Sequence, residues 1–339
     1  MGYPGLSRAE MGLYSRHMAE LGTPAIPARL ARSARRLFVG RSSGWWGGLL
    51  LLMISLPCFL TLPWSLSRYD IQRMADPAMQ NAAPSLDQPM GSDDLGRSVM
   101  WRCLLGGAIS LGIGGSAAMI AVGIGVMWGA LAGYVGGKTD AAMMRAVDVL
   151  YGLPYILLVV MISLALQPLM LSLLRGRLGL DSTLSANAAG IATLLIAIGG
   201  VSWLTMSRVV RGQVLSLRSQ PFIEATRAIG AGPVRVFLKH LLPNLVGVIV
   251  VYATLAVPLA ILQESFLSFL GIGVRPPLPS WGNLAADGVG QLTKLATPGT
   301  EVYWWQLVFP CVLLGMTLMA LNFLGDALRD RFDPRRQQR

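Results

Sequence analysis

A few ionisable or amide side chains of this sequence lie within or beside long apolar runs. Glu264 follows Gln263 inside the run 245–270, and Arg145 and Asp148 lie at the start of the run 144–166. Ionisable groups in such surroundings are costly, so each is a functional candidate by default. Gln263 and Glu264 could line a path through the protein, or Glu264 could make a structural hydrogen bond within a helix bundle. Arg145 and Asp148 favour a helix-end contact or a local ion pair.

No combination of side chains forms a plausible catalytic site. The segment 132–139 ends like a phosphate-binding loop, but Ala132 stands where that motif requires glycine, and no nucleotide-binding domain surrounds it. Neither His17 nor His240 has a cluster of possible metal ligands around it. The cysteines lie in or beside apolar segments, as small hydrophobic residues do, and they are Cys58, Cys103 and Cys311. We therefore predict no catalytic residue, no metal site and no cofactor.

The composition indicates a membrane protein. Hydrophobic residues make up 53% of the 339 residues, whereas charged residues make up 13%, about half of what a soluble chain of this length carries. The net charge of +11 does not indicate nucleic-acid binding, because the basic residues lie where the chain leaves the apolar runs.

Six apolar segments are long enough to cross a bilayer core about 30 Å thick. The first segment is not followed by the small residues that mark the cleavage site of a signal peptide, so we expect it to be a retained membrane anchor. The fold class is therefore an all-α integral membrane protein with six transmembrane helices. The predicted spans are Trp45–Leu66, Leu104–Tyr134, Met144–Leu166, Ala189–Ser207, Leu245–Leu270 and Trp304–Leu324.

Lys and Arg counts predict the orientation. Four segments on one side of the predicted spans hold 20 of the 28 basic residues, which favours the cytoplasmic side for them and for both termini. Arg175 and Arg177 lie on the other side; a re-entrant stretch at 168–180 is one explanation, which the sequence leaves open. The predicted organisation is a cytoplasmic segment at 1–44, a first transmembrane helix at 45–66, an extracytoplasmic loop at 67–103, a core domain at 104–325 that includes the cytoplasmic loop 208–243, and a cytoplasmic tail at 326–339.

The loop 208–243 is too long and too patterned for a simple connection. Pro221 suits a first helical turn, and Gly230 followed by Pro233 predicts a stop. A second short helix is expected at 233–242, with Pro243 ending it. In the first helix, apolar residues share one face and charged residues lie outside it: Phe222, Ala225 and Ile229 against Glu224 and Arg227. Such a helix could lie on lipid, pack on its own domain, or dock in a groove of a soluble partner.

The segment 224–230, Glu-Ala-Thr-Arg-Ala-Ile-Gly, followed after nine residues by 240–244, His-Leu-Leu-Pro-Asn, resembles the EAA loop of bacterial ABC importer permeases. Thr226 stands in place of the usual second alanine. The resemblance extends over nearly the whole chain and narrows to the dipeptide, oligopeptide and nickel permeases. The further matching segments are 91–97, 129–154, 264–271, 276–282, 304–310 and 322–335.

This resemblance implies a function and a set of partners. The chain would be the permease subunit of an ATP-driven importer of di- or oligopeptides in the cell inner membrane, without an ATPase site of its own. The partners would be a second, homologous permease subunit, two ATP-binding subunits, an extracytoplasmic solute-binding protein, a peptide and the lipid bilayer. Nickel or a metal chelate is the alternative substrate, and a secondary transporter is the alternative class. The implied coupling residues are Phe222, Glu224, Ala225, Arg227, Gly230, Leu242 and Pro243.

Overall fold

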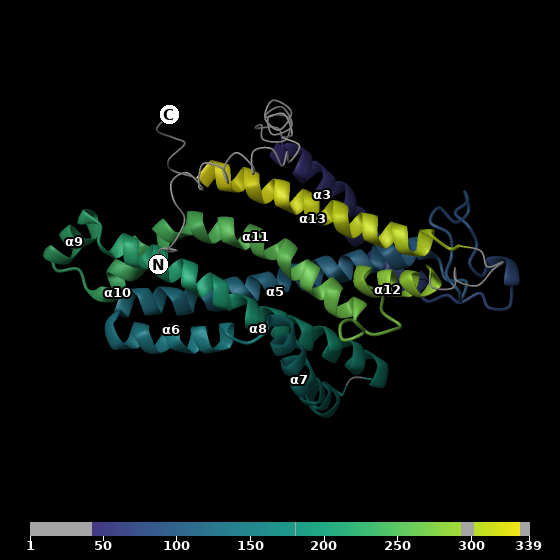
Figure 1. Ribbon diagram of the computed structural model, residues 1–339, viewed down its shortest axis with the longest axis horizontal. Coiled ribbons are helices and arrows are strands. Elements are labelled where there is room, and N and C mark those ends of the chain that lie inside the picture. Colours follow the sequence, from purple (N-terminus) through teal and green to yellow (C-terminus); the bar gives the residue numbers. More distant parts are fainter. Residues whose placement is uncertain (1–42, 180, 293–301, 333–339) are drawn as a thin grey trace, which may run out of the picture. The chain divides into compact units, whose positions relative to one another are not determined.

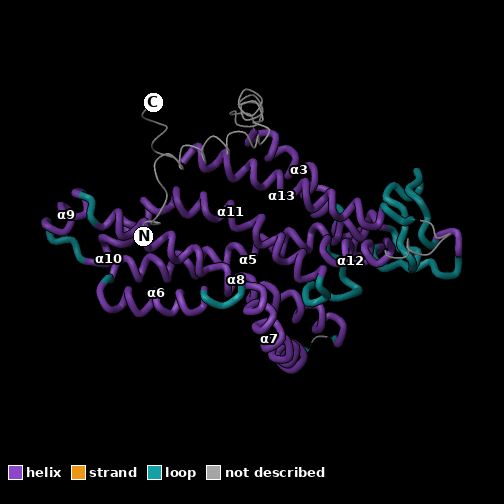
Figure 2. The backbone as a smooth tube through the Cα atoms, viewed as in Figure 1, coloured by secondary structure: helices purple, strands orange, loops and turns teal. Residues whose placement is uncertain are grey.

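The computed structural model describes residues 43–179, 181–292 and 302–332 (Figure 1). Residues Gly44–Arg339 form one compact unit. The predicted N-terminal segment and the last residues of the predicted tail lie outside the described residues. Every regular element of the described part is a helix (Figure 2), apart from one isolated bridge between Ser92 and Ser98.

The helices differ in length from a short turn to 37 residues. They are α3 (Ser43–Leu60), α4 (Leu62–Arg68), η1 (Pro77–Met79), α5 (Val99–Val135), α6 (Gly137–Tyr151), α7 (Tyr155–Leu178), α8 (Ser182–Arg218), α9 (Pro221–Ala228), α10 (Pro233–Val236), the π-helical turn η2 (Phe237–Leu241), α11 (Leu242–Phe269), α12 (Trp281–Leu292) and α13 (Trp305–Phe332).

Five of these helical stretches are long and apolar enough to cross a membrane, and there are six if the bent pair α3–α4 counts as one span. The pair bends by 58°. Pro63 lies in the first turn of α4, where a proline is tolerated because its missing N–H would have had no helical partner. The all-α membrane architecture is confirmed.

The predicted third span was placed wrongly. Instead of starting at Met144, the membrane-length helix α7 begins at Tyr155, and residues 137–151 form the separate helix α6. Pro154 causes the break, because it lacks an N–H and disfavours helical geometry in the residue before it. The stretch for which a re-entrant conformation was left open is helical as far as Leu178, since α7 continues through Pro168 without interruption.

The second short helix of the loop does not end at Pro243. Helix α10, the π-helical turn and α11 form one continuous helical stretch from Pro233 to Phe269. Leu242 and Pro243 directly follow the π-helical turn inside this stretch, and the N–H of Leu242 donates to the carbonyl oxygen of Phe237. The proline that suggested a stop therefore lies within a continuing helix.

Helix α5 is the centre of the unit and packs along α8 (Figure 1). Glycines spaced by four residues allow the two backbones to come close. A Cβ atom added to Gly129 would lie 2.2 Å from the carbonyl oxygen of Ser207, and one added to Gly125 would lie 2.5 Å from the Cβ of Met206. Helix α3 packs on α13 in the same way, through Gly47 against Phe323.

This packing predicts the effect of a single methyl group. We expect Gly129→Ala to lower the free energy of unfolding by about 1–3 kcal/mol, because the methyl group overlaps the backbone of α8. The measurement is thermal unfolding of the purified protein in detergent. Gly123→Ala is the matched control, because it lies on the same helix with open space around it and should be neutral or slightly stabilising. Equal effects of the two substitutions would contradict the backbone contact.

Candidate functional site

Helix α9 is attached to the bundle by one buried side chain. Ile223 is fully buried and packs with Val236 and Leu241 of the following helical segment. Phe222 is 42% exposed and Ile229 is 85% exposed. The predicted apolar face of α9 thus points away from its own domain, and the residue that holds the helix in place, Ile223, was not singled out from the sequence.

The other residues predicted for α9 are exposed as well. Glu224, Ala225 and Arg227 are exposed on α9. Neither Glu224 nor Arg227 makes an ion pair with another residue in the part of the chain that the structure describes. Leu242 and Pro243 lie at the base of α11 instead, beyond the π-helical turn. The predicted coupling residues therefore form one exposed helix and one helix base, joined through Gly230 and α10.

Gly230 ends α9 in a left-handed conformation. Its φ is +84°, and an added Cβ atom would have no neighbour within 4 Å. The N–H of Ala231 donates to the carbonyl oxygen of Thr226, as in a glycine-terminated helix. The requirement for glycine is therefore conformational and does not arise from crowding.

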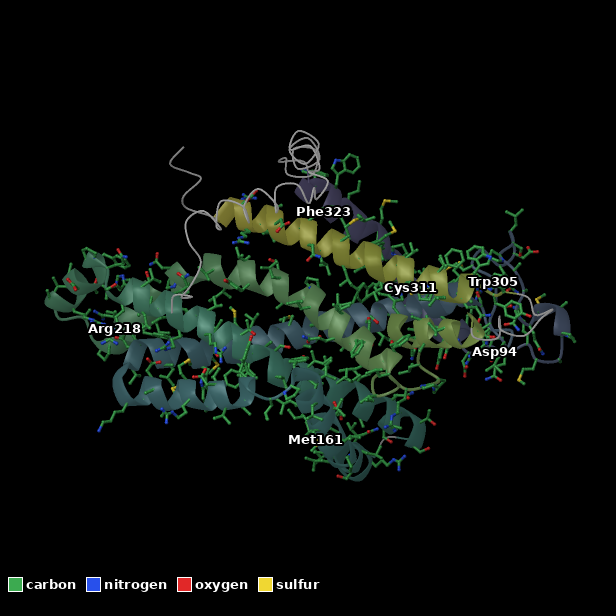
Figure 3. The ribbon with its side chains drawn as sticks, viewed as in Figure 1. Asp94, Met161, Arg218, Trp305, Cys311 and Phe323 are labelled. Carbon is green, nitrogen blue, oxygen red and sulfur yellow. The ribbon has the colours of Figure 1, made fainter. Side chains whose placement is uncertain are left out.

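Tyr134, near the end of α5, joins the loop to the two long helices. Its hydroxyl donates to the carbonyl oxygen of Pro233 at 2.8 Å, and its ring lies 5.5 Å from that of Phe237. Arg218, the last residue of α8, donates to the carbonyl oxygen of Tyr134 at 3.1 Å. Figure 3 shows Arg218 at the end of the unit that carries α9, whereas Trp305 lies at the other end. Tyr134 thus connects the start of α10 to the end of α5, and Arg218 connects the end of α8 to the end of α5.

Two ion pairs fix α6 against α8. The Arg211 guanidinium donates to both carboxylate oxygens of Asp140, and Arg208 donates to Asp148 at 2.7 Å. Asp148 therefore pairs across to α8 and not with Arg145. The Arg211 guanidinium holds the pKa of the Asp140 carboxyl below its usual value, mainly through these hydrogen bonds and against the opposing effect of desolvation.

A cavity of about 480 Å³ opens between α5, α8, α11 and the junction of α6 with α7. Its wall is mostly apolar. Three polar side chains from different helices meet in it: Tyr155 of α7, Ser202 of α8 and Gln263 of α11. The remaining lining residues are Ala121, Val122, Leu150, Tyr151, Leu153, Leu158, Val201, Leu204, Thr205, Met206, Tyr252, Leu255, Ala256 and Leu259.

The two adjacent residues predicted to line a path lie in different surroundings. Gln263 lines the cavity, whereas Glu264 is fully buried and does not. The hydroxyl of Ser268 donates to the Glu264 carboxylate at 2.7 Å, and that of Ser265 does so at 3.3 Å. The backbone N–H of Val274 donates in turn to Ser268 at 3.0 Å. The contacts of Glu264 are those of a structural hydrogen-bond centre at the end of α11.

The loop before α5 is held by a second polar centre. Asp93 accepts hydrogen bonds from the backbone N–H groups of Leu95 and Arg97 and from the side chains of Arg97 and Arg102. Trp305 and Gln306 of α13 donate to the carbonyl oxygen of Ser92. The conspicuous segment 91–97 therefore folds the loop onto α5 and α13. In the described residues, no three His, Cys, Asp or Glu side chains come together in a way that could hold a metal ion.

Residues 125–338 match the family described as the binding-protein-dependent transport system inner membrane component. The chain belongs to this family of membrane permeases. The match covers residues 125–135 of α5, the whole of α8, the loop with α9, the cavity helix α11 and α13. The permease is thus a multi-pass membrane protein. Members of its family are membrane components of transport systems and not enzymes.

Individual relatives of this permease carry more specific names. The dipeptide transport system permease protein of Bacillus subtilis (strain 168) is 41% identical over 256 residues, which are 76% of this chain and 71% of that protein. An oligopeptide transport system permease protein of Haemophilus influenzae is 40% identical over 259 residues, 76% of this chain and 74% of that protein. The oligopeptide permease protein of Escherichia coli (strain K12) is 38% identical over 308 residues, 90% and 91% of the two chains.

The Asp140–Arg211 pair predicts a pH dependence of stability. Because the folded pKa of Asp140 is depressed, the pair stabilises the fold fully above the ordinary aspartate pKa of about 4 and loses this effect as pH falls through the lower folded value. We expect Asp140→Asn to lower the free energy of unfolding at pH 7 by less than about 1 kcal/mol, and the unfolding temperature to fall accordingly. The difference from wild type should shrink below pH 4.

The matched control is Asp148→Asn, which breaks the more exposed pair with Arg208. It should change the stability by less than about 0.5 kcal/mol at pH 7. Thermal unfolding in detergent between pH 3 and pH 8 gives both comparisons. A difference for Asp140→Asn that grows towards low pH would contradict the assignment.

Proposed function

We propose that this chain is one of two permease subunits of an ATP-driven importer that carries di- or oligopeptides across the cell inner membrane. Separate ATP-binding subunits energise the transport, and an extracytoplasmic solute-binding protein delivers the peptide. The named relatives, with identities of 38–41%, support the peptide substrate. In this proposal, the end of the unit with α9 is cytoplasmic, as are both termini, and the loop 67–103 is extracytoplasmic.

The observation that carries the proposal is the exposed apolar face of α9. A short helix that presents Phe222 and Ile229 outwards, while Ile223 fixes its base, is suited to a groove of a second protein. The segment after α9 is bonded to α5 through Tyr134 and Pro233, and Arg218 at the end of α8 is bonded to the same tyrosine, so a displacement of α9 can reach both long helices. We therefore assign Phe222, Glu224, Ala225, Arg227 and Gly230 to the contact with the ATP-binding subunit.

The cavity supports the second part of the proposal, the solute path. It is walled by α5 and α8, the helices whose ends carry the loop, and by α11, which starts at Leu242 and Pro243. Its polar atoms belong to hydroxyl and amide groups, which suit peptide groups better than a nickel ion. Gln263 is the path residue that we propose. Glu264 takes part by holding the end of α11 in place.

Substitution of the exposed face of α9 should uncouple the complex. We expect Phe222→Ala with Ile229→Ala to weaken binding of the ATP-binding subunits about tenfold or more, because truncating anchor residues of an interface costs at least about 1.4 kcal/mol. The measurement is the affinity of the purified permease pair for its ATP-binding subunits. Leu86→Ala is the control, because Leu86 is also an exposed apolar side chain but lies in the loop before α5. Unchanged affinity in the double variant would overturn the role of α9.

Gly230 gives a second test of the same helix. Gly230→Val places a β-branched side chain at φ +84°, which costs about 1–3 kcal/mol and displaces the end of α9. We expect loss of peptide uptake with the chain still inserted in the membrane. Gly232→Ala is the matched control, because Gly232 has φ −65° and open space around it. Normal transport by Gly230→Val would count against the proposal that the turn at Gly230 connects α9 rigidly to α10.

The substrate is tested by uptake of labelled di- and oligopeptides and of nickel into cells with and without this chain. We expect peptide uptake to disappear when the chain is deleted and nickel uptake to remain. Loss of nickel uptake alone would show that the substrate is nickel and not a peptide, while the importer function would stand. If neither uptake is lost, the proposed importer function is wrong.

A further inference from the structure

Three side chains in the cavity form one hydrogen-bonded group, which we call the Gln263 trio: Tyr155, Ser202 and Gln263. The Tyr155 hydroxyl donates to Oε1 of Gln263, and the Ser202 hydroxyl donates to the same oxygen at 3.3 Å. Tyr155 and Ser202 also contact each other at 3.3 Å. Because a carbonyl oxygen has two lone pairs, these two donors occupy the acceptor side of the amide. The trio therefore fixes the Gln263 side chain from two neighbouring helices.

The donor side of this amide remains available. No residue in the described ranges accepts a hydrogen bond from Nε2 of Gln263, and this nitrogen is not among the buried atoms that lack a partner. Nε2 is thus accessible, in a side chain that lines the cavity. An amide N–H₂ group held in this way can donate to a carbonyl oxygen of a molecule that enters the cavity.

The cavity wall carries no ionised side chain. Its described lining residues include no Asp, Glu, Lys, Arg or His. Arg208 comes near, because its guanidinium lies 3.9 Å from the ring centre of the lining residue Tyr151, but Asp148 neutralises it. A charged group of a solute would therefore lose water without gaining a counter-charge from this chain, whereas a neutral amide could keep its hydrogen bonds.

From these observations we infer that the cavity selects for uncharged segments of its substrate, and that the Gln263 amide binds a backbone carbonyl oxygen of the peptide. This inference rests on the proposed peptide-import function and adds a chemical preference at the site. Apolar side chains of the peptide contact the leucines and the tyrosines of the wall. The charged ends of a short peptide lie outside this cavity, in water or against another subunit. Gln263 is a specificity-determining residue in this arrangement.

The test is uptake into vesicles that contain the complete transporter, meaning this chain, its permease partner and the ATP-binding subunits, with saturating loaded binding protein. Three labelled tripeptides that differ only in the central residue serve as probes: leucine, lysine and glutamate. For wild type, we expect the leucine peptide to enter about tenfold faster than either charged peptide, the factor that corresponds to 1.4 kcal/mol. Rates at saturation separate this effect from capture by the binding protein.

Gln263→Glu is the decisive variant, because it keeps the shape of the side chain and places a carboxylate in the cavity. We expect the ratio of lysine-peptide to glutamate-peptide uptake to rise about tenfold or more. Gln167→Glu is the matched control. Gln167 accepts a hydrogen bond from Arg275 at 3.0 Å outside the cavity, so the same new charge there should leave the ratio unchanged.

Each outcome has a separate meaning. A Gln263→Glu ratio within twofold of wild type, in a variant that still imports the leucine peptide, would overturn the inference. Equal wild-type rates for the three peptides would also overturn it. If wild type imports none of the peptides, the proposed function fails before the cavity is tested. If Gln263→Glu is not inserted in the membrane, Gln263→Leu replaces it, and a loss of leucine-peptide uptake of about tenfold is expected from the missing amide donor.

Discussion

The close approach of α5 to α8 is the contact on which the other parts of this permease depend. It is a contact between backbones, because Gly129 faces the carbonyl oxygen of Ser207 without a side chain between them. Along this seam, Arg211 pairs with Asp140 of α6, Tyr134 bonds to the segment after α9 at Pro233, and Ser202 faces the cavity. A side chain in the seam would separate the helices and move all three features together.

The sequence predicted the class of fold because apolar length is a strong local property. It failed where a proline has two possible effects. Pro154 separates α6 from α7 and shifts the third span, whereas Pro243 follows a π-helical turn and the helix continues through it. Local sequence does not distinguish the two cases, because a helix precedes the proline in both and only the backbone path just before the proline differs. Gly230 was predictable, since its positive φ is a local requirement.

The site was predicted in part. An apolar span has no polar face to show its orientation, so adjacent residues such as Gln263 and Glu264 could not be assigned to cavity or core from the sequence. About 100° of helix rotation separates them, and the structure places one in the cavity and the other among serine hydroxyls. Ile223 and Tyr134 were missed for a different reason, because their roles are contacts with other helical segments that the local sequence does not reveal.

The order of helices along the chain bears on how the protein is made. In the most apolar 18 residues of α7, 11% of the residues are buried within the unit, whereas 56% are buried in the corresponding stretch of α8. Helix α7 is thus a span that lipid alone can accommodate, and α8, which carries Arg208 and Arg211, depends on protein neighbours. During synthesis, α5, α6 and α7 all precede α8. The helix least suited to lipid therefore leaves the ribosome when its helix partner α5 and its acidic partners Asp140 and Asp148 are already present.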